Sequence, residues 1–411
     1  MKRTLVICLT LVLLLTAVTL PAGAVVTRRG DISGDGRLTV LDALQTLTGI
    51  LRGDSMTNVD MNGDGVVSLL DILRMCRYAS AGDSFTQNTR LFAPSKSGIY
   101  NYCPSVMQTA DGNTRYIYYC TNQASKIVTD YIGCRVGTKQ ANGTFSYGAE
   151  SIVLSPTSAT WDARHTCDPS VIAGTFEFGG ENYGYLMAYL GCTSNDNQDN
   201  EIGFAVAKSP TGPFVKIAST PTIAYVRDGD DWQWGVGQAS LVSADKAGQV
   251  YVFYTEGTSK RTHEFVDLWD FSDADAPERL SHTDLKVTGL KNMNNNTDYI
   301  ANADFAYDPD SNSYYMAIDA HPYPSDTPDY IAGSFRVAYF NGTNLASPSW
   351  KSLEVIGSSE TGRLRNHNVG LVRDMYGHLP TGNSLTVIYT GNTNGSNALW
   401  DYRLYEYTIC K

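Results

Sequence analysis

From residue 93 onward, short apolar runs rich in Tyr, Val and Phe alternate with turns of Gly, Asn and Ser. The runs come in groups of three, and five such groups follow one another. Their first runs open with similar segments, spaced 64 to 70 residues apart: CPSVM, DPSVI, QASLV, DFAYD and NVGLV. Five all-β units of such regular length predict a five-bladed β-propeller over residues 93–411 rather than a sandwich.

The first residue of each unit has a definite place in this fold. The first strand of every blade lines the central channel of a propeller, so equivalent strand-start residues form a ring at one mouth of the channel. Our alignment predicts a ring of Cys103, Asp168, Gln238, Asp304 and Asn368. The fifth unit ends at Lys411 after its third run, so we expect the segment 89–95 to add the missing outer strand.

Residues 25–81 follow a different pattern. Two apolar stretches of helical period each come directly after a loop rich in Asp and Gly, at 31–42 and 60–71. Both loops fit D-x-[NS]-x-D-G-x-x-[ST]-x-x-D, which supplies oxygen ligands at positions 1, 3, 5, 9 and 12, a backbone carbonyl at position 7 and a turn glycine at position 6. Because the loops stand in tandem, we predict a small α-helical module with two Ca²⁺ ions. The predicted ligands are Asp31, Ser33, Asp35, the Arg37 carbonyl, Thr39, Asp42, Asp60, Asn62, Asp64, the Val66 carbonyl, Ser68 and Asp71.

Neither loop is preceded by a full entering helix, and residues 28–80 thereby resemble a dockerin, the duplicated module that docks cellulosomal enzymes onto the cohesin domains of a scaffold protein. The resemblance implies a cohesin domain as partner. In dockerins, loop positions 10 and 11 help to select the cohesin, and here they hold Val40-Leu41 and Leu69-Leu70. These apolar pairs either form an exposed docking surface or pack the small core of the module itself. Both interpretations agree with the sequence.

The N-terminal end of the chain predicts export. Lys2 and Arg3, an apolar run from residue 5 to residue 20 and the sequence Ala22-x-Ala24 predict a secretion signal at residues 1–24 that is removed. No other run is apolar for long enough to cross a membrane. A small-polar linker is expected at residues 82–92, between the module and the propeller.

Composition limits the class of protein and the kinds of molecule that it binds. The chain is 42% hydrophobic and only 18% charged, so it has enough apolar residues for a sizeable core. Its formal charge of −11 argues against nucleic acid or anionic lipid and suits a neutral substrate such as a polysaccharide. Eight cysteines less Cys8 of the signal leave seven, and no disulfide pair can be recognised from their spacing, so we expect buried free thiols.

The second unit carries a further resemblance. It contains DPSV at its start, WDARHTCDPS around that start and IGFAVAKSPTGPF in its third run, which together look like the family 43 glycoside hydrolases and their arabinanase, xylosidase and fructosidase relatives over residues 95–411. The resemblance implies a plant cell-wall polysaccharide as substrate, with arabinose- or xylose-containing glycans favoured. It also implies an Asp general base on blade one, an Asp on blade two that orients the acid, and a Glu general acid on blade three. Only Asp168 carries over, because Cys103 stands at the base position and Gln238 at the acid position.

Three hypotheses remain for the ring. In the first, hydrolysis uses other carboxylates, with Asp304 as base, Glu256 on the rim as acid and Asp168 between them. In the second, the propeller only binds a glycan, and Cys103, Gln238 and Asn368 belong to the binding residues. In the third, Cys103 is a nucleophile and His367 of the neighbouring fifth blade lies beside it.

The candidate reactive groups also have structural interpretations. Asp168 and Asp304 suit strand-start caps that bond turn amides. Glu256 fits a solvated loop carboxylate, and Cys103 fits a small buried apolar residue. The same residues therefore agree with an enzyme and with a binding propeller. Fusion to a dockerin, a module that mostly accompanies hydrolases, favours a glycoside hydrolase by association, with the binding propeller as the alternative.

Three larger side chains complete the set of candidates. Trp161 and Trp234 either stack on sugar faces or pack between blades. His367 stands where the family often has a His beside an ion or a water, so a further ion in the propeller channel is an expectation from the resemblance.

Overall fold

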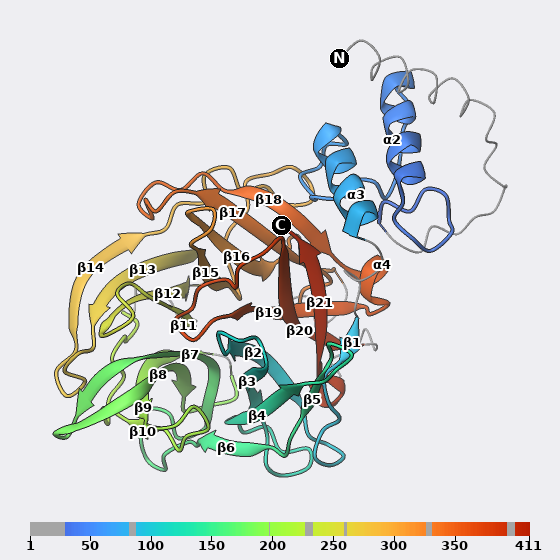
Figure 1. Cartoon of the computed structure of the whole chain (residues 1–411). Helices are drawn as coiled ribbons and strands as arrows, with labels where there is room; N and C mark the ends of the chain where they lie inside the picture. The colour runs from blue at the N-terminus through green and yellow to red at the C-terminus, as the bar shows by residue number, and fades with distance from the viewer. Residues whose placement is uncertain are drawn as a thin grey trace.

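The computed structural model describes residues 29–81, 88–196, 198–226, 233–258, 261–325, 331–392 and 399–411. The predicted secretion signal lies outside these residues, as does the part of the predicted linker at 82–87. Figure 1 shows two helices beside a larger body whose sheets are arranged around a common centre. No helix in the described part of the chain is long and apolar enough to cross a membrane.

The helical module consists of α2 (Val40–Arg52) and α3 (Leu69–Ala81), each of which follows one of the Asp-rich loops. At the start of α2, the Asp42 carboxylate accepts hydrogen bonds from the backbone and the hydroxyl of Thr39. The helix ends at Gly53, whose φ of 75° is a left-handed conformation that favours glycine. Apolar side chains from both repeats then form one small core, which includes Leu38, Val59, Met61, Met75 and Tyr78.

The second repeat of this module rests against the β-body. Arg74 of α3 forms a buried ion pair with Glu354, and the Tyr78 hydroxyl donates to the same carboxylate at 2.5 Å. The Arg336 guanidinium donates to the carbonyl of Gly63 in the second loop at 3.0 Å. Since a buried charge is costly without a partner, these contacts hold the module in one position on the β-body.

Within the described residues, the strands form one nine-stranded sheet and three four-stranded sheets. The nine-stranded sheet joins two antiparallel units through one parallel pairing, so the strands divide into five units. Unit one contains β2 (Asn101–Gln108), β3 (Thr114–Thr121), β4 (Tyr131–Lys139), β5 (Phe145–Tyr147) and β6 (Ser151–Leu154). Unit two contains β7 (His165–Phe178), β8 (Glu181–Cys192), β9 (Glu201–Ala207) and β10 (Val215–Lys216). Unit three contains β11 (Gln233–Ser243), β12 (Gln249–Thr258), β13 (Thr262–Asp270) and β14 (Glu278–Asp284). Unit four contains β15 (Asp304–Asp308), β16 (Ser313–Asp319), β17 (Phe335–Asn341) and β18 (Lys351–Ile356), and unit five contains β19 (Arg365–Arg373), β20 (Ser384–Asn392), β21 (Arg403–Cys410) and β1 (Thr89–Arg90).

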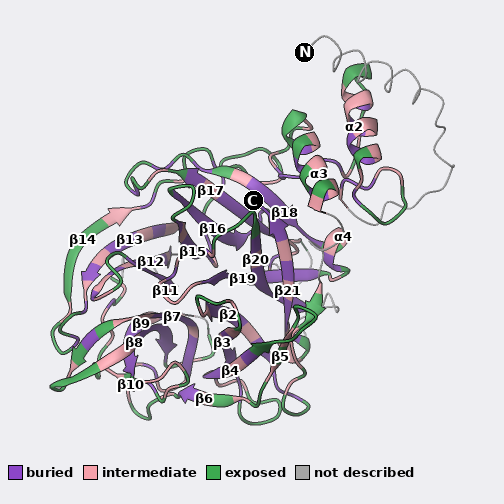
Figure 2. Ribbon diagram, viewed as in Figure 1, coloured by how far each residue is buried: buried purple, intermediate pink, exposed green. Residues whose placement is uncertain are grey.

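The ring of units closes between the two ends of the chain. β1 pairs antiparallel with β21, which confirms the prediction that the segment 89–95 supplies the outer strand of unit five. Since β1 lies within the residues expected as linker, 82–92, that predicted boundary extends too far into the β-body. A short parallel pairing of β19 with β2, at Val372 and Val106, joins units five and one. Figure 2 shows buried residues near the centre and exposed residues on outer strands such as β14. Short elements, α4 (Ser358–Thr361) and the 3₁₀ helix η3 (Leu399–Asp401), lie in connections.

The backbone conformation shows that one of the five predicted ring residues is wrong. Each unit has one residue with left-handed φ, between 44° and 55°, at the equivalent point of its inner strand, and these are Cys103, Asp168, Gln238, Asn302 and Asn368. The fourth ring residue is therefore Asn302, and the alignment that placed Asp304 there is wrong by two residues. Asp304 instead corresponds to Ser240, because Asn302-Ala303-Asp304 repeats Gln238-Ala239-Ser240. The apolar pattern of DFAYD concealed the shift.

One arginine on the axis bonds to all the other units. Arg373, at the end of β19, is fully buried and forms an ion pair with Asp304 at 3.0 Å. Its guanidinium also donates to the hydroxyls of Ser105, Ser170 and Ser240 and to the carbonyls of Leu241 and Phe305, at 2.9 to 3.3 Å. The second oxygen of Asp304 accepts the Leu371 backbone N–H at 2.8 Å. In units one to four, the side chain two positions after the ring residue is thus bonded to this one charged group.

We predict that Arg373→Met lowers the free energy of unfolding by about 3–5 kcal/mol, because Asp304 is left buried without its cation. Urea unfolding of the full chain, followed by tryptophan fluorescence, measures this loss. Arg90→Met, on the exposed strand β1, is the control and should change stability by less than about 0.5 kcal/mol. Equal midpoints for the two variants would show that the axial cluster does not hold the units together.

Candidate functional site

The five ring residues surround a small cavity at the mouth of the channel. Its volume is about 40 Å³, and its lining consists of Cys103, Pro104, Asp168, Pro169, Gln238, Ala239, Asn302, Ala303, Asp304, Asn368 and Val369. Such a volume suits a water molecule or a single ion, so a sugar ring would lie over these side chains. A larger depression of about 680 Å³ lies at the outer edge near Trp269, where Glu278 is the one carboxylate of the described lining. The ring is the better candidate for the functional site, because polar side chains from all five units converge on its cavity.

Amide side chains on one side of the ring satisfy one another. Gln238 Oε1 accepts the Asn302 backbone N–H at 2.8 Å, and Gln238 Nε2 donates to Asn302 Oδ1. Asn302 donates to Asp319 at 2.7 Å, and the Asn368 backbone N–H donates to the other Asp319 oxygen at 3.1 Å. Burial raises the pKa of Asp319 to about 7. Our sequence analysis missed Asp319, although an Asp in an otherwise apolar run was a signal that could have found it.

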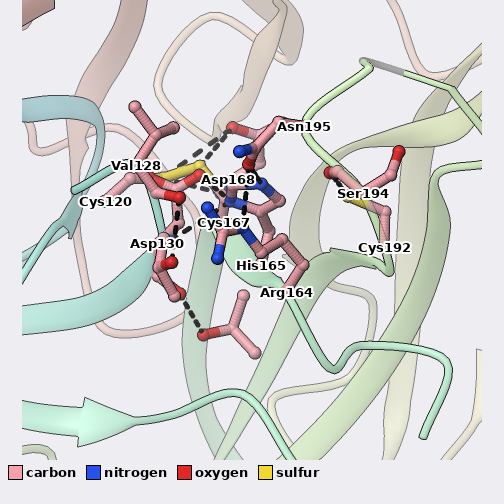
Figure 3. Close-up of polar contacts among 12 residues, drawn as sticks. Cys120, Val128, Asp130, Arg164, His165, Cys167, Asp168, Cys192, Ser194 and Asn195 are labelled. Carbon is pink, nitrogen blue, oxygen red and sulfur yellow. Dashed lines mark hydrogen bonds and ion pairs between the residues drawn. A yellow bond between two sulfur atoms is a disulfide. The ribbon is translucent and has the colours of Figure 1, made fainter.

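Asp168 faces a group of sulfur atoms at the mouth of the channel (Figure 3). Its Oδ1 lies 3.3 Å from Cys167 Sγ, and its backbone N–H donates to Cys120 Sγ at 3.0 Å. The Cys103 sulfur lies within 4.8 Å of the carboxylate. Burial raises the pKa of Asp168 to about 6, while the nearby Cys103 thiol acts in the opposite direction. This carboxyl group therefore exchanges its proton in the range in which general acids work.

Cys120 and Cys167 form a disulfide between β3 and β7. The expectation of free thiols was wrong for this pair, because the two residues are 47 positions apart and meet through the contact of units one and two. The other cysteines of the described residues are free thiols, as expected: Cys76, Cys103, Cys134, Cys192 and Cys410. The disulfide fixes the first two units next to Asp168.

The structure separates the three carboxylates that the first hypothesis combines. Asp304 uses one oxygen for Ser240 and Arg373 and the other for the Leu371 backbone. Glu256 lies on β12 opposite Val236, is partly exposed, and does not line the cavity. Asp168 is therefore left without either of the proposed carboxylate partners in position to react.

The nucleophile hypothesis lacks the contact that it needs. His367 Nδ1 lies 2.9 Å from Asn368 Oδ1, and burial lowers the pKa of His367 to about 4, which keeps the ring neutral. Its Nε2 has no hydrogen-bond partner among the described residues. Cys103 accepts a hydrogen bond from the Asn368 amide. Burial and the charge of Asp168 raise the pKa of the Cys103 thiol, so the thiolate is disfavoured.

The two tryptophans differ in their surroundings. Trp161 stacks on Tyr189 at 5.6 Å and packs against a core cluster between units one and two, as the packing interpretation expects. Trp234 is partly buried and packs on the cluster of Cys103, Cys120, Cys167 and Leu190. Of the two, Trp234 adjoins the ring.

A second polar group near Asp168 was not predicted. His165, three residues before Asp168 on β7, forms a 2.6 Å contact with Asp130 through Nδ1 and a 2.6 Å contact with Asn195 through Nε2. The Tyr100 hydroxyl donates to the other oxygen of Asp130 at 2.6 Å. Figure 3 shows His165 and Asp130 near Cys167 and Asp168. The sequence around "ARHTCDPS" contained the histidine, but Asp130 comes from another unit.

The two Asp-rich loops share one pattern of hydrogen bonds. The carboxylate at position 1, Asp31 or Asp60, accepts the backbone N–H groups of positions 4, 5 and 6. The carboxylate at position 12, Asp42 or Asp71, accepts those of positions 3 and 9. Asp31, Asp42 and Asp71 are fully buried, which is unfavourable for carboxylates without a cation. The residues therefore fit Ca²⁺, whose oxygen ligands they supply.

The apolar pairs that follow these loops lie outside the core of the module. Val40, Leu69 and Leu70 are 56%, 62% and 58% exposed, and Leu41 is partly buried. None of the four belongs to the core cluster among the described residues of the module. The structure therefore favours the docking surface over the core-packing interpretation.

We predict that the protonation of Asp168 contributes to stability in a pH-dependent way. Because its pKa is about 6 in the folded chain and 3.8 ordinarily, its contribution is fully present below the lower value and is lost as the pH rises through the higher one. The loss is at most about 3 kcal/mol, since the side chain is partly exposed at the mouth. Asp168→Asn should therefore raise the free energy of unfolding relative to the parent at about pH 8 more than at about pH 4. Urea unfolding at both pH values measures this, and an equal difference at both would contradict it.

Comparison with known proteins agrees with both parts of this description. Residues 29–80 match the family model of the dockerin type I domain, and no curated protein matches the chain. The structure is similar to that of a family 117 glycoside hydrolase from the marine bacterium Zobellia galactanivorans, at 12% identity and a TM-score of 0.50, over 79% of this chain and 89% of that chain. It is also similar to a structure described as a glycoside hydrolase, at 14% identity and a TM-score of 0.52, over 79% and 91% of the two chains. At these identities the likeness concerns the fold, so the chain joins a dockerin type I domain to a β-propeller of the kind found in glycoside hydrolases.

Proposed function

We propose that the propeller binds a neutral plant cell-wall polysaccharide, with arabinose- or xylose-containing glycans favoured, over the ring at the mouth of its channel. The observation that carries this proposal is the position of Asp168, whose carboxyl group lines the cavity beside the sulfur cluster on which Trp234 packs. Sugars are recognised by an aromatic surface together with a few fixed polar groups. Cys103, Gln238, Asn302 and Asn368 supply the other polar groups around the cavity.

Hydrolysis of the same polysaccharide is the second candidate. Asp168 favours it, because a carboxyl group with a pKa of about 6 can donate a proton to a leaving group near neutral pH. The two carboxylates of a glycosidase must flank the bond that breaks, and neither Asp304 nor Glu256 is free to act at the cavity. Binding without turnover therefore agrees better with the geometry.

The experiment uses the full chain with arabinan, arabinoxylan, xylan, pectin and fructan. We expect the chain to be retained on at least one polysaccharide in affinity gels and to release no sugar. Retention of Asp168→Asn should be at least about tenfold weaker, because the hydrogen bond between the sugar and a charged carboxylate is lost. Asp111→Asn, in an exposed turn, is the matched control and should bind as the parent does.

The outcomes separate the candidates. Released product that disappears in Asp168→Asn would establish hydrolysis in place of binding alone. Retention on none of the polysaccharides, or equal retention of both variants, would remove the ring as the glycan site.

We further propose that the chain is exported and that its dockerin, with two bound Ca²⁺ ions, docks to a cohesin domain through Val40, Leu69 and Leu70. These side chains are exposed although apolar, and such a surface is typical of a protein interface. Calcium joins the buried carboxylates of each loop, so its removal should unfold the module.

Capture on an immobilised type I cohesin tests this docking. We expect capture in Ca²⁺, loss of capture in a chelator, and at least tenfold weaker capture of Leu70→Asp because a charge replaces a buried apolar contact. Leu280→Asp, on the exposed strand β14 and 43% exposed in the parent, should be captured normally. Capture that persists after calcium removal would contradict the proposal.

A further inference from the structure

Three cysteine sulfurs and one carboxylate converge beside the ring. They belong to Cys103 on β2, Cys120 on β3, and Cys167 and Asp168 on β7, and their potential ligand atoms all lie within 4.8 Å of one another. Cys120 and Cys167 form the disulfide, and Cys103 is a free thiol. Cys103 and Asp168 line the cavity at the mouth, so a small ion in the channel reaches this group directly.

Each of the three sulfurs has one polar group placed to donate a hydrogen bond. The Asp168 backbone N–H donates to Cys120 Sγ at 3.0 Å, and the Tyr102 hydroxyl lies 3.2 Å from Cys167 Sγ. The Asn368 amide donates to Cys103 Sγ. Donors of this kind orient metal-bound ligands and stabilise the negative charge of a thiolate. A cluster that served only to fill space would not need one donor for each sulfur.

We propose that reduction of the Cys120–Cys167 disulfide creates a site for one divalent ion of the zinc class, bound by Cys103, Cys120, Cys167 and Asp168. Three thiolates and a carboxylate are a ligand set that Zn²⁺ accepts in tetrahedral geometry. Thiolates select such ions over Ca²⁺ and Mg²⁺, which prefer oxygen. The site therefore differs in chemistry from the two dockerin loops, whose ligands are all oxygen atoms.

An external dithiol supplies the two electrons that reduce the Cys120–Cys167 disulfide. One thiolate of the dithiol attacks a disulfide sulfur, the S–S bond breaks, and the second thiolate of the dithiol completes its own cyclic disulfide. Two electrons and two protons remain on Cys120 and Cys167 as thiols. The metal ion then replaces the three thiol protons, which pass to solvent. In the oxidised chain two of the four ligands are tied up in the disulfide, so the site exists in the reduced state alone.

The test uses the full chain with its dockerin saturated with Ca²⁺. One half is treated with dithiothreitol and desalted without air, the other half is left oxidised, and both are titrated with Co²⁺ and with Zn²⁺. We expect the reduced chain to bind one more ion than the oxidised chain, with a sulfur-to-cobalt charge-transfer band. Equal binding by the two halves would overturn the proposal.

Two cysteine variants separate this site from other thiols. Cys103→Ser keeps the disulfide and, after reduction, should bind the ion at least about tenfold more weakly. Cys134→Ser removes a buried thiol of the same unit that lies outside the cluster, and it should bind as the parent does. Unchanged binding by reduced Cys103→Ser would overturn the proposal. A reduced parent that has lost its native tryptophan fluorescence would do so too, because the ligands come from two units that must remain in contact.

Discussion

The ion pair between Arg373 and Asp304 on the axis is the contact on which the rest of the propeller depends. A fully buried guanidinium is costly unless its charge is paired and most of its donors are satisfied. Nη1 and Nη2 of Arg373 find acceptors in all four other units, while its Nε has no hydrogen-bond partner among the described residues. The residues that bond to it through their side chains lie two positions after ring residues. The same contact that closes the core thus fixes the ring side chains at the mouth of the channel, including Asp168.

The surroundings of Asp168 suit a thiol better than a carboxylate at position 103. A second carboxylate next to Asp168 would raise the pKa of Asp168 further by charge repulsion, whereas the neutral Cys103 thiol lowers it. On the other side of the ring, Gln238 and Asn302 bond to each other, and neither amide is an acid or a base near neutral pH. Asp319, whose pKa burial raises to about 7, has both oxygens bonded to Asn302 and Asn368. Among the five ring residues, Asp168 is therefore the one carboxyl group, which suits recognition of a neutral glycan better than paired acid and base catalysis.

The sequence predicted those features that depend on local pattern. The regular spacing of the units, the closing strand β1 and the Asp positions of the two Asp-rich loops follow from turns and apolar runs within short segments. The features it did not predict depend on side chains from different units. No local pattern distinguishes Arg373 from the other arginines, because its partners come from other units. Cys120 and Cys167 likewise lie in different units. Asn302 is recognised as a ring residue only by its backbone conformation. The sequence left open whether Val40-Leu41 and Leu69-Leu70 belong to the core of the module, and the packed module shows that they do not.

Glycan recognition by the ring is tested most directly by a crystal structure of the chain with an oligosaccharide of the polysaccharide that it retains. We expect a sugar over the ring, with a hydroxyl group about 3 Å from an Asp168 oxygen and one sugar face on Trp234. A sugar bound instead in the outer depression beside Trp269, with the ring untouched, would show that the ring is not the glycan site.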